Sequence, residues 1–114
     1  MEDILQVTSE ELGGIPVVHV SGEVDVSTAP VLHDALAAVP ESSARVVVDL
    51  SAVTFLDSTG IGVLVAALMR LRDGPSAGTL GLVVTRPHLN KVLEVTGLTT
   101  IFDIHPSLEG ALAR

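Results

Sequence analysis

The feature that most constrains the fold of this chain is a short run of apolar residues. It lies between two segments whose apolar residues repeat at helical spacing. Residues Arg45 to Leu50 carry Val46, Val47 and Val48 in succession. A continuous run of this kind predicts a strand that is covered on both faces. Because helical patterns precede and follow it, the strands must pair in parallel through right-handed crossovers. The sequence therefore predicts an α/β domain.

The two helices beside this strand have recognisable ends. The first is predicted to begin at Ser27 or Thr28, with Pro30 in its first turn, and to end near Pro40. The second is predicted from Asp57 to about Arg72, and its apolar residues repeat at helical spacing.

The remaining elements complete one domain over residues 1–114. The predicted strands are Ile4 to Thr8, Ile15 to Gly22, Thr79 to Val84 and Ile101 to Ile104, and the other helices are Pro87 to Gly97 and Leu108 to Ala113. Gly13-Gly14 predicts a turn between the first two strands, and Ser51 to Asp57 is predicted to be a loop. We expect a mixed β-sheet with an antiparallel N-terminal edge hairpin followed by βα units, about five strands and four helices.

Composition excludes several classes of function. Fourteen acidic against six basic residues, with two Phe and no Tyr or Trp, leave little with which to bind nucleic acid. The absence of cysteine excludes disulfides, thiol nucleophiles and Cys-zinc sites. The four histidines lack the spacing of a metal site, so we expect no bound metal.

No membrane segment is expected either. The longest nearly unbroken apolar stretch, Ile61 to Met69, falls well short of the roughly 20 residues that cross a bilayer. The chain opens with Met1, Glu2 and Asp3, which does not resemble a secretory signal. We therefore expect a cytoplasmic location.

Polar residues follow two of the predicted strands. Functional groups in open α/β sheets gather beyond the carboxyl ends of parallel strands. Glu23, Asp25, Ser27 and Thr28 follow one strand, and Asp57-Ser58-Thr59-Gly60 follows the next. If these strands are parallel neighbours, Asp25 and Ser58 lie at one edge of the domain.

Each group also has a purely structural interpretation. Asp57 to Gly60 matches a helix N-cap, worth roughly 1 kcal/mol, and Glu23 and Asp25 match solvated acids at a strand end. Against this, Gly60 and Gly62 lie at the start of a helix, where each costs about 0.8 to 1 kcal/mol relative to alanine. Such glycines indicate that something approaches the backbone closely there.

Several segments together resemble the STAS domains of bacterial anti-sigma factor antagonists. The matching segments are Gly22-Glu23-Val24-Asp25, Ser27-Thr28-Ala29, Val48-Asp49-Leu50, and Phe55-Leu56 leading into Asp57-Ser58-Thr59-Gly60-Ile61-Gly62. Thr96-Gly97-Leu98 before Ile101 to Ile104 resembles the family's third helix and last strand. The resemblance covers essentially the whole chain in the right order.

The resemblance implies a phosphorylation site and partners. In the family, a partner that is both anti-sigma factor and kinase phosphorylates the serine after the motif aspartate, which is Ser58 here, although Thr59 offers a second hydroxyl. The family's strand-end aspartate corresponds to Asp25, and a PP2C-type phosphatase is implied to restore the unmodified form. The partner-binding residues that we expect are Glu23, Asp25, Ser27, Thr28, Asp57, Thr59, Gly60 and Ile61.

Elementary electrostatics supports a switch at Ser58. A phosphoserine adds about −1.5 to −2 charge, which a helix N-terminus can accept. A partner covering it beside Asp25 and Asp57 would have to desolvate that charge, and a penalty of about 4 kcal/mol weakens binding roughly a thousandfold. The chain has no Gly-rich phosphate loop with Lys, so ATP and magnesium must come with the kinase. We expect no cofactor and no enzymatic activity in this chain.

Enzymatic alternatives fit the sequence poorly. A serine hydrolase would need the G-x-S-x-G elbow, which is absent around Ser58, and the histidines are expected to be ordinary, partly exposed residues. A phospho-aspartate receiver built on Asp49 or Asp57 needs a downstream lysine, and the only lysine, Lys91, lies inside a predicted helix.

The serious alternative uses the same scaffold without a switch. A constitutive, non-phosphorylated STAS subunit of a lipid transporter or a stress-signalling assembly would have a very similar sequence. The intact Ser58 and Asp25 favour the phosphorylation switch.

Overall fold

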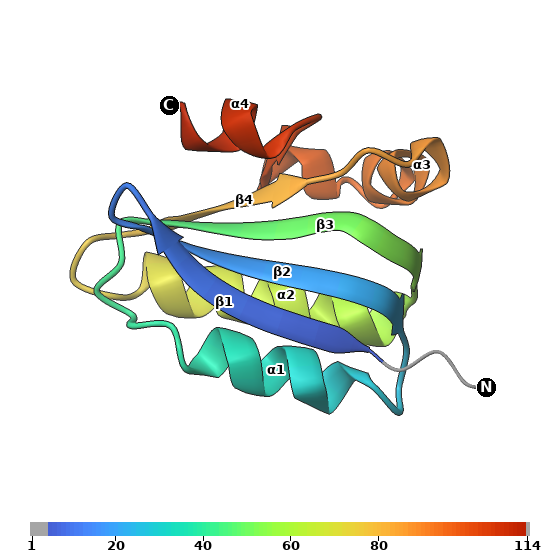
Figure 1. Ribbon diagram of the computed structural model, residues 1–114, viewed down its shortest axis with the longest axis horizontal. Coiled ribbons are helices and arrows are strands. Elements are labelled where there is room, and N and C mark those ends of the chain that lie inside the picture. The colour runs from blue at the N-terminus through green and yellow to red at the C-terminus, as the bar shows by residue number, and fades with distance from the viewer. Residues whose placement is uncertain (1–4, 114) are drawn as a thin grey trace.

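One five-stranded sheet, with strands in the order β1-β2-β3-β4-β5, organises residues 5–113, which the computed structural model describes (Figure 1). β1 pairs antiparallel with β2, and all other neighbouring strands pair in parallel. The elements are β1 (Gln6–Leu12), β2 (Ile15–Val24), α1 (Ala29–Ala37), β3 (Arg45–Leu56), α2 (Ser58–Arg72), β4 (Thr79–Val83), α3 (Pro87–Val95), the 3₁₀ helix η1 (Leu98–Thr100), β5 (Asp103–His105) and α4 (Leu108–Leu112). The predicted mixed sheet with an antiparallel edge and four α-helices is confirmed.

The N-terminal hairpin closes at the predicted turn. Gly13 and Gly14 have φ values of 59° and 82°, in the left-handed region that glycine adopts readily. The predicted end of the first strand at Thr8 is wrong, because pairing continues to Leu12 opposite Ile15. Its predicted start, Ile4, lies outside the described residues, and β2 continues two residues beyond Gly22.

β3 is longer than the sequence predicts, and the additional residues lead directly into the site. The segment from Ser51 to Leu56 was predicted to be a loop, but it is a continuation of the strand. β4 pairs with β3 only as far as Asp49, so among the described strands the rest of β3 pairs with β2 alone. Burial therefore alternates irregularly there, and the continuous apolar run that marks a strand stops at Leu50.

Helices cover both faces of the sheet (Figure 1). α1 and α2 lie on one face and build the larger core, in which Leu32 and Leu64 are fully buried. α4 lies on the other face, where Ala111 packs in a smaller cluster with Val17, Val47 and Val83. Within residues 5–113, no helix combines the length and apolarity needed to cross a bilayer.

The C-terminal elements are shifted from their predicted bounds. α3 ends at Val95, and Gly97, with φ 77°, leads into η1. The last strand was predicted at Ile101 to Ile104, but the residues that pair with β4 are those of β5, and Phe102 is buried in the larger core.

Candidate functional site

The carboxyl ends of β2 and β3 lie side by side. Val24 and Leu56 are register partners, and the Asp57 N–H donates a hydrogen bond to the Val24 carbonyl over 3.2 Å. Each strand then leads into a helix, at the right-hand end of the molecule in Figure 1. As the sequence predicts, the segments carrying Asp25 and Ser58 therefore begin from neighbouring strand ends. We call residues 23–28 and 57–61 together the switch edge.

Asp57 caps α2, and the side chain of Ser58 is exposed to solvent. The backbone of Asp57 is extended, and its Oδ1 accepts hydrogen bonds from the N–H of Thr59 at 2.9 Å and of Gly60 at 3.1 Å. Ser58 is the first residue of the helix and is exposed. Within residues 5–113, its hydroxyl has no hydrogen-bond partner. The N-cap interpretation is thus correct for Asp57, and it leaves the hydroxyl of Ser58 accessible.

Asp25 organises the loop between β2 and α1. Its Oδ1 accepts from the Ser27 hydroxyl at 2.8 Å, the Ser27 N–H at 3.0 Å and the Thr28 N–H at 3.1 Å. The hydrogen bond from the Ser27 hydroxyl, followed by those from the Thr28 and Ser27 backbone, holds the pKa of Asp25 below its ordinary value. Asp25 is therefore ionised and held in a defined place on the switch edge.

Thr28 has a different role from the predicted one. It stands at the N-cap position of α1, but its hydroxyl makes no capping hydrogen bond. Instead, Thr28 Oγ1 donates to the Glu23 carbonyl at 2.8 Å and accepts from the Asp25 N–H at 2.9 Å. Four of the predicted partner-binding residues, from Glu23 to Thr28, thus form one hydrogen-bonded turn.

Two predicted site residues face inward. Gly60 is buried, and a Cβ placed there would lie 2.5 Å from Val24 Cγ1 and 2.6 Å from Leu56 Cδ1. Glycine is required at this position because the first turn of α2 packs directly on the two strand ends. Ile61 is half-buried against the larger core.

Exposed apolar side chains accompany the polar ones. Val26 is 73% exposed, and Phe55, at the end of β3, is 48% exposed. An open, mostly apolar hollow of about 360 Å³ lies beside Thr59, lined by Val26, Ala29, Pro30, His33, Thr59 and Val63. Neither residue was predicted to bind a partner, and Phe55 was named only as part of a motif that resembles the family. For Val26, the available signal was an apolar residue directly after a strand-end acid.

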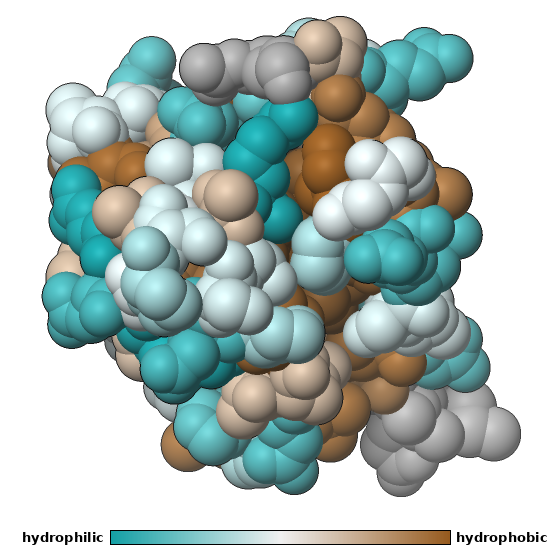
Figure 2. All heavy atoms as spheres, turned by 90° about the vertical axis from the view of Figure 1, so that its left-hand side faces the viewer, coloured by the Kyte–Doolittle hydropathy of each residue, from teal (hydrophilic) through white to brown (hydrophobic). Residues whose placement is uncertain are grey.

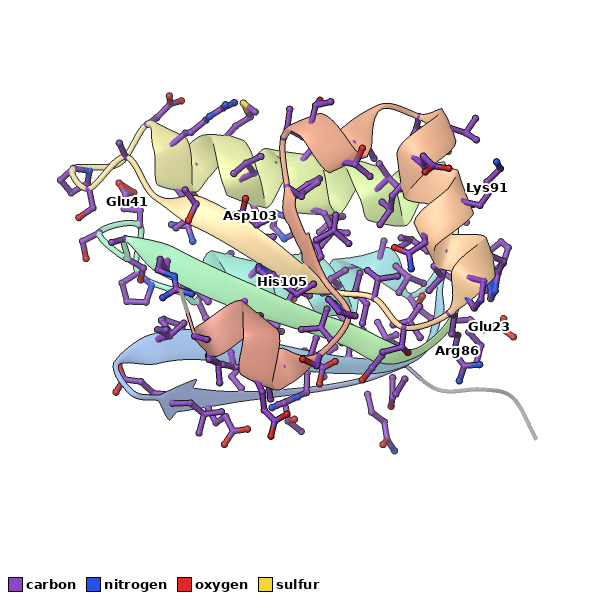
Figure 3. The ribbon with its side chains drawn as sticks, turned by 90° about the horizontal axis from the view of Figure 1, so that it is seen from above. Glu23, Glu41, Arg86, Lys91, Asp103 and His105 are labelled. Atoms are coloured by element: carbon purple, nitrogen blue, oxygen red, sulfur yellow. The ribbon has the colours of Figure 1, made fainter. Side chains whose placement is uncertain are left out.

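Glu23 lies at the same end of the molecule. On β2 it pairs with Phe55, and Figure 3 shows it at the end of the sheet where Arg86 leads into α3. The opposite end, which carries the β1–β2 turn, shows hydrophilic and hydrophobic side chains intermixed (Figure 2).

A second polar cluster lies away from the switch edge. His19 on β2 places Nε2 2.6 Å from Glu10 Oε2 on β1 and Nδ1 2.9 Å from Asp49 Oδ2 on β3. Burial opposes a charge on His19, but the hydrogen bonds with the two carboxylates outweigh it and raise its pKa above 6.5. Asp49 also accepts a hydrogen bond from the Ser51 hydroxyl. His19 is thus part of a structural cluster that crosses three strands, which the sequence analysis did not detect.

Comparison with known proteins identifies the family. The family model described as "Mlab, STAS domain" matches residues 7–106. The anti-sigma-B factor antagonist of Bacillus subtilis (strain 168) is 35% identical over 95 residues, which cover 83% of this chain and 85% of that protein. The chain belongs to the STAS-domain family of anti-sigma factor antagonists.

Other similar proteins cover nearly the whole STAS domain. The anti-sigma-F factor antagonist RsfB of Mycobacterium tuberculosis (strain ATCC 25618 / H37Rv) is 32% identical over 113 residues, covering 96% of this chain and 88% of that protein. The crystal structure of an anti-sigma factor antagonist from Mycobacterium paratuberculosis superposes with a TM-score of 0.86 at 39% identity, covering 95% of this chain and 91% of that chain. The resemblance stated from the sequence motifs is therefore confirmed.

Proposed function

We propose that this STAS domain is a cytoplasmic anti-sigma factor antagonist switched by phosphorylation of Ser58. Unmodified, it binds an anti-sigma factor that is also a serine kinase, and so frees the sigma factor. Phosphorylated, it releases that partner. The observation that carries the proposal is the exposed Ser58 hydroxyl at the start of α2, which has no hydrogen-bond partner among residues 5–113. It lies one residue after the cap Asp57 and beside the loop of Asp25.

The charges of the switch edge explain why a phosphate would end binding. The carboxylate of Asp57 accepts the N–H groups of Thr59 and Gly60, so the first turn of α2 already holds one negative charge. Asp25 adds a second carboxylate at the neighbouring strand end. A partner that covers this edge would have to desolvate a dianion next to both, and a penalty of about 4 kcal/mol weakens binding roughly a thousandfold.

The fold itself should tolerate the modification. The Ser58 side chain is exposed and its hydroxyl makes no hydrogen bond among the described residues, so a phosphate on it replaces no side-chain hydrogen bond there. The partner supplies the ATP, the magnesium and the base for the transfer, and this chain supplies only the hydroxyl. A PP2C-type phosphatase then removes the phosphate and restores binding.

The partner-binding surface that we propose is the switch edge together with its exposed apolar neighbours. Val26 and Phe55 supply apolar area, and the turn from Glu23 to Thr28 supplies fixed polar groups. Thr59 borders the hollow between α1 and α2. Gly60 and Ile61 contribute indirectly, by seating the helix against the strand ends.

The decisive experiment locates the phosphate. The protein is incubated with ATP, magnesium and a candidate anti-sigma kinase from its source cell, and the modified residue is mapped by mass spectrometry. We expect phosphate on Ser58 in the parent and in a Thr59→Ala control, and none in Ser58→Ala, which should still bind the kinase. Phosphate on Thr59 instead, or none with any cognate kinase, would contradict the proposal.

A constitutive STAS interaction subunit is the second candidate function. It predicts that Ser58→Asp binds the partner as tightly as the parent does, whereas the switch predicts a large loss of affinity. The affinities of the parent and of Ser58→Asp for the partner, measured by calorimetry, distinguish the two functions. The exposed Ser58 favours the switch.

A further inference from the structure

Two glycines follow Ser58 in α2, and packing explains only one of them. At Gly60, a Cβ would collide with Val24 and Leu56. At Gly62, which is exposed, a Cβ would meet nothing within 4 Å among the described residues. Glycine is a poor helix former, so any ordinary residue at position 62 would suit the helix better. The fold therefore gives no reason for glycine at position 62.

The geometry of a helix points to a reason outside the fold. Helical side chains tilt toward the N-terminus, so a residue covers the surface of the turn before it. Gly62 comes four residues after Ser58 and therefore lies one turn above it on the same helix face. A long side chain at position 62 would extend over the Ser58 hydroxyl, whereas a single methyl group would not reach it.

We propose that Gly62 determines access to Ser58: its missing side chain keeps the hydroxyl open to the active site of the partner kinase. The inference rests on the proposed function, since it concerns the phosphorylation of Ser58. In the transfer, Ser58 Oγ bonds to the γ-phosphorus of ATP, the bond from that phosphorus to the β–γ bridging oxygen breaks to release ADP, and the hydroxyl proton passes to a base of the kinase. An in-line approach of this kind needs free space on the side of the hydroxyl that faces ATP.

The first test compares three variants as kinase substrates. Gly62→Leu should lower the rate of Ser58 phosphorylation by roughly 100-fold, the size of loss that a displacement of about 1 Å causes at a reacting group. Gly62→Ala should keep the parent's rate, because its methyl group is too short. Ala66→Leu, an exposed position one further turn along α2, is the matched control and should also keep that rate.

Equal rates for Gly62→Leu and the parent would overturn the inference, and so would an equal slowing by Ala66→Leu. Circular dichroism melting checks folding. Since leucine favours a helix more than glycine does, Gly62→Leu should melt no lower than the parent. Gly62→Gln repeats the test with a polar side chain of similar length.

A second test needs no partner. The chain contains no cysteine, so Ser58→Cys introduces a single thiol whose reaction with an aromatic disulfide reagent reports its accessibility. Adding Gly62→Leu should slow this reaction roughly tenfold, while adding Gly62→Ala or Ala66→Leu should leave it within about twofold. An unchanged rate with Gly62→Leu would refute the inference.

The two tests separate the inference from the function on which it rests. If the kinase leaves Ser58 of the parent unmodified while Gly62→Leu still shields the introduced thiol, the proposed function fails and the steric inference holds. If the parent is phosphorylated and Gly62→Leu changes neither rate, the proposed function holds and the inference fails.

Discussion

The same substitution at two positions of α2 should change stability in different directions. Gly60→Ala and Gly62→Ala each add one methyl group to the same helix, two residues apart. Each gains about 0.8 to 1 kcal/mol of helix propensity, and this gain is common to both. At Gly62 the methyl group meets no neighbour in the part of the chain that the structure describes, so the whole gain should appear as added stability.

At Gly60 the methyl group has no space. It would lie 2.5 Å from Val24 Cγ1 and 2.6 Å from Leu56 Cδ1. Val24 is fully buried and, being β-branched, is stiff, so it cannot turn aside cheaply. Overpacking of this kind costs about 1 to 3 kcal/mol. Because the propensity gains cancel, the difference in stability between the variants should equal this cost, with Gly60→Ala the less stable.

Urea unfolding followed by far-ultraviolet circular dichroism measures the difference. The chain has no Trp or Tyr, so intrinsic fluorescence is not a convenient signal. The gap of about 1 to 3 kcal/mol corresponds to about 4 to 12 °C between the melting temperatures of the two variants. Equal stabilisation by both substitutions would refute the contact of α2 with the two strand ends.

Three further predictions concern individual polar groups. Asp57→Ala should destabilise the domain by about 1 kcal/mol through loss of the α2 cap, measured by urea unfolding, whereas Asp57→Asn should cost much less; equal losses would mean that charge, not capping, is the contribution. Asp25→Asn keeps an acceptor oxygen for the N–H groups of Ser27 and Thr28, so it should leave the melting temperature nearly unchanged. The same substitution should impair partner binding or phosphorylation. A large drop in melting temperature would instead show that the charge of Asp25 stabilises the fold. The raised pKa of His19 means that its ion pairs with Glu10 and Asp49 contribute stability that is fully present below the ordinary pKa and is lost as pH rises through the folded-state pKa. His19→Gln should therefore be more destabilising at about pH 6 than at about pH 9, and an equal loss at both would contradict this assignment.

Local signals made the first turn of α2 predictable. The cap Asp57 and the exposed Ser58 depend on residues within one helical turn, and a sequence displays such short-range relations directly. The same holds for the glycine turn between β1 and β2. The fold class followed from the alternation of strand and helix patterns.

Long-range relations were not visible in the same way. The extension of β3 to Leu56 depends on pairing with β2 alone, so its residues lack the continuous apolar pattern that marked Arg45 to Leu50. His19 contacts Asp49, 30 residues away, only because the parallel register of β2 and β3 places the two residues opposite one another.

The strand order follows the chain order, and this has a consequence for how such a domain can diverge. β2, α1, β3 and the start of α2 position every residue of the switch edge, and all of them precede β4. The segment after Arg72 supplies two more strands and covers the other face of the sheet through α4. That later segment also packs into the larger core through Leu89, Leu93 and Phe102, so substitutions there can alter the stability of the whole domain without replacing any residue that a partner would contact.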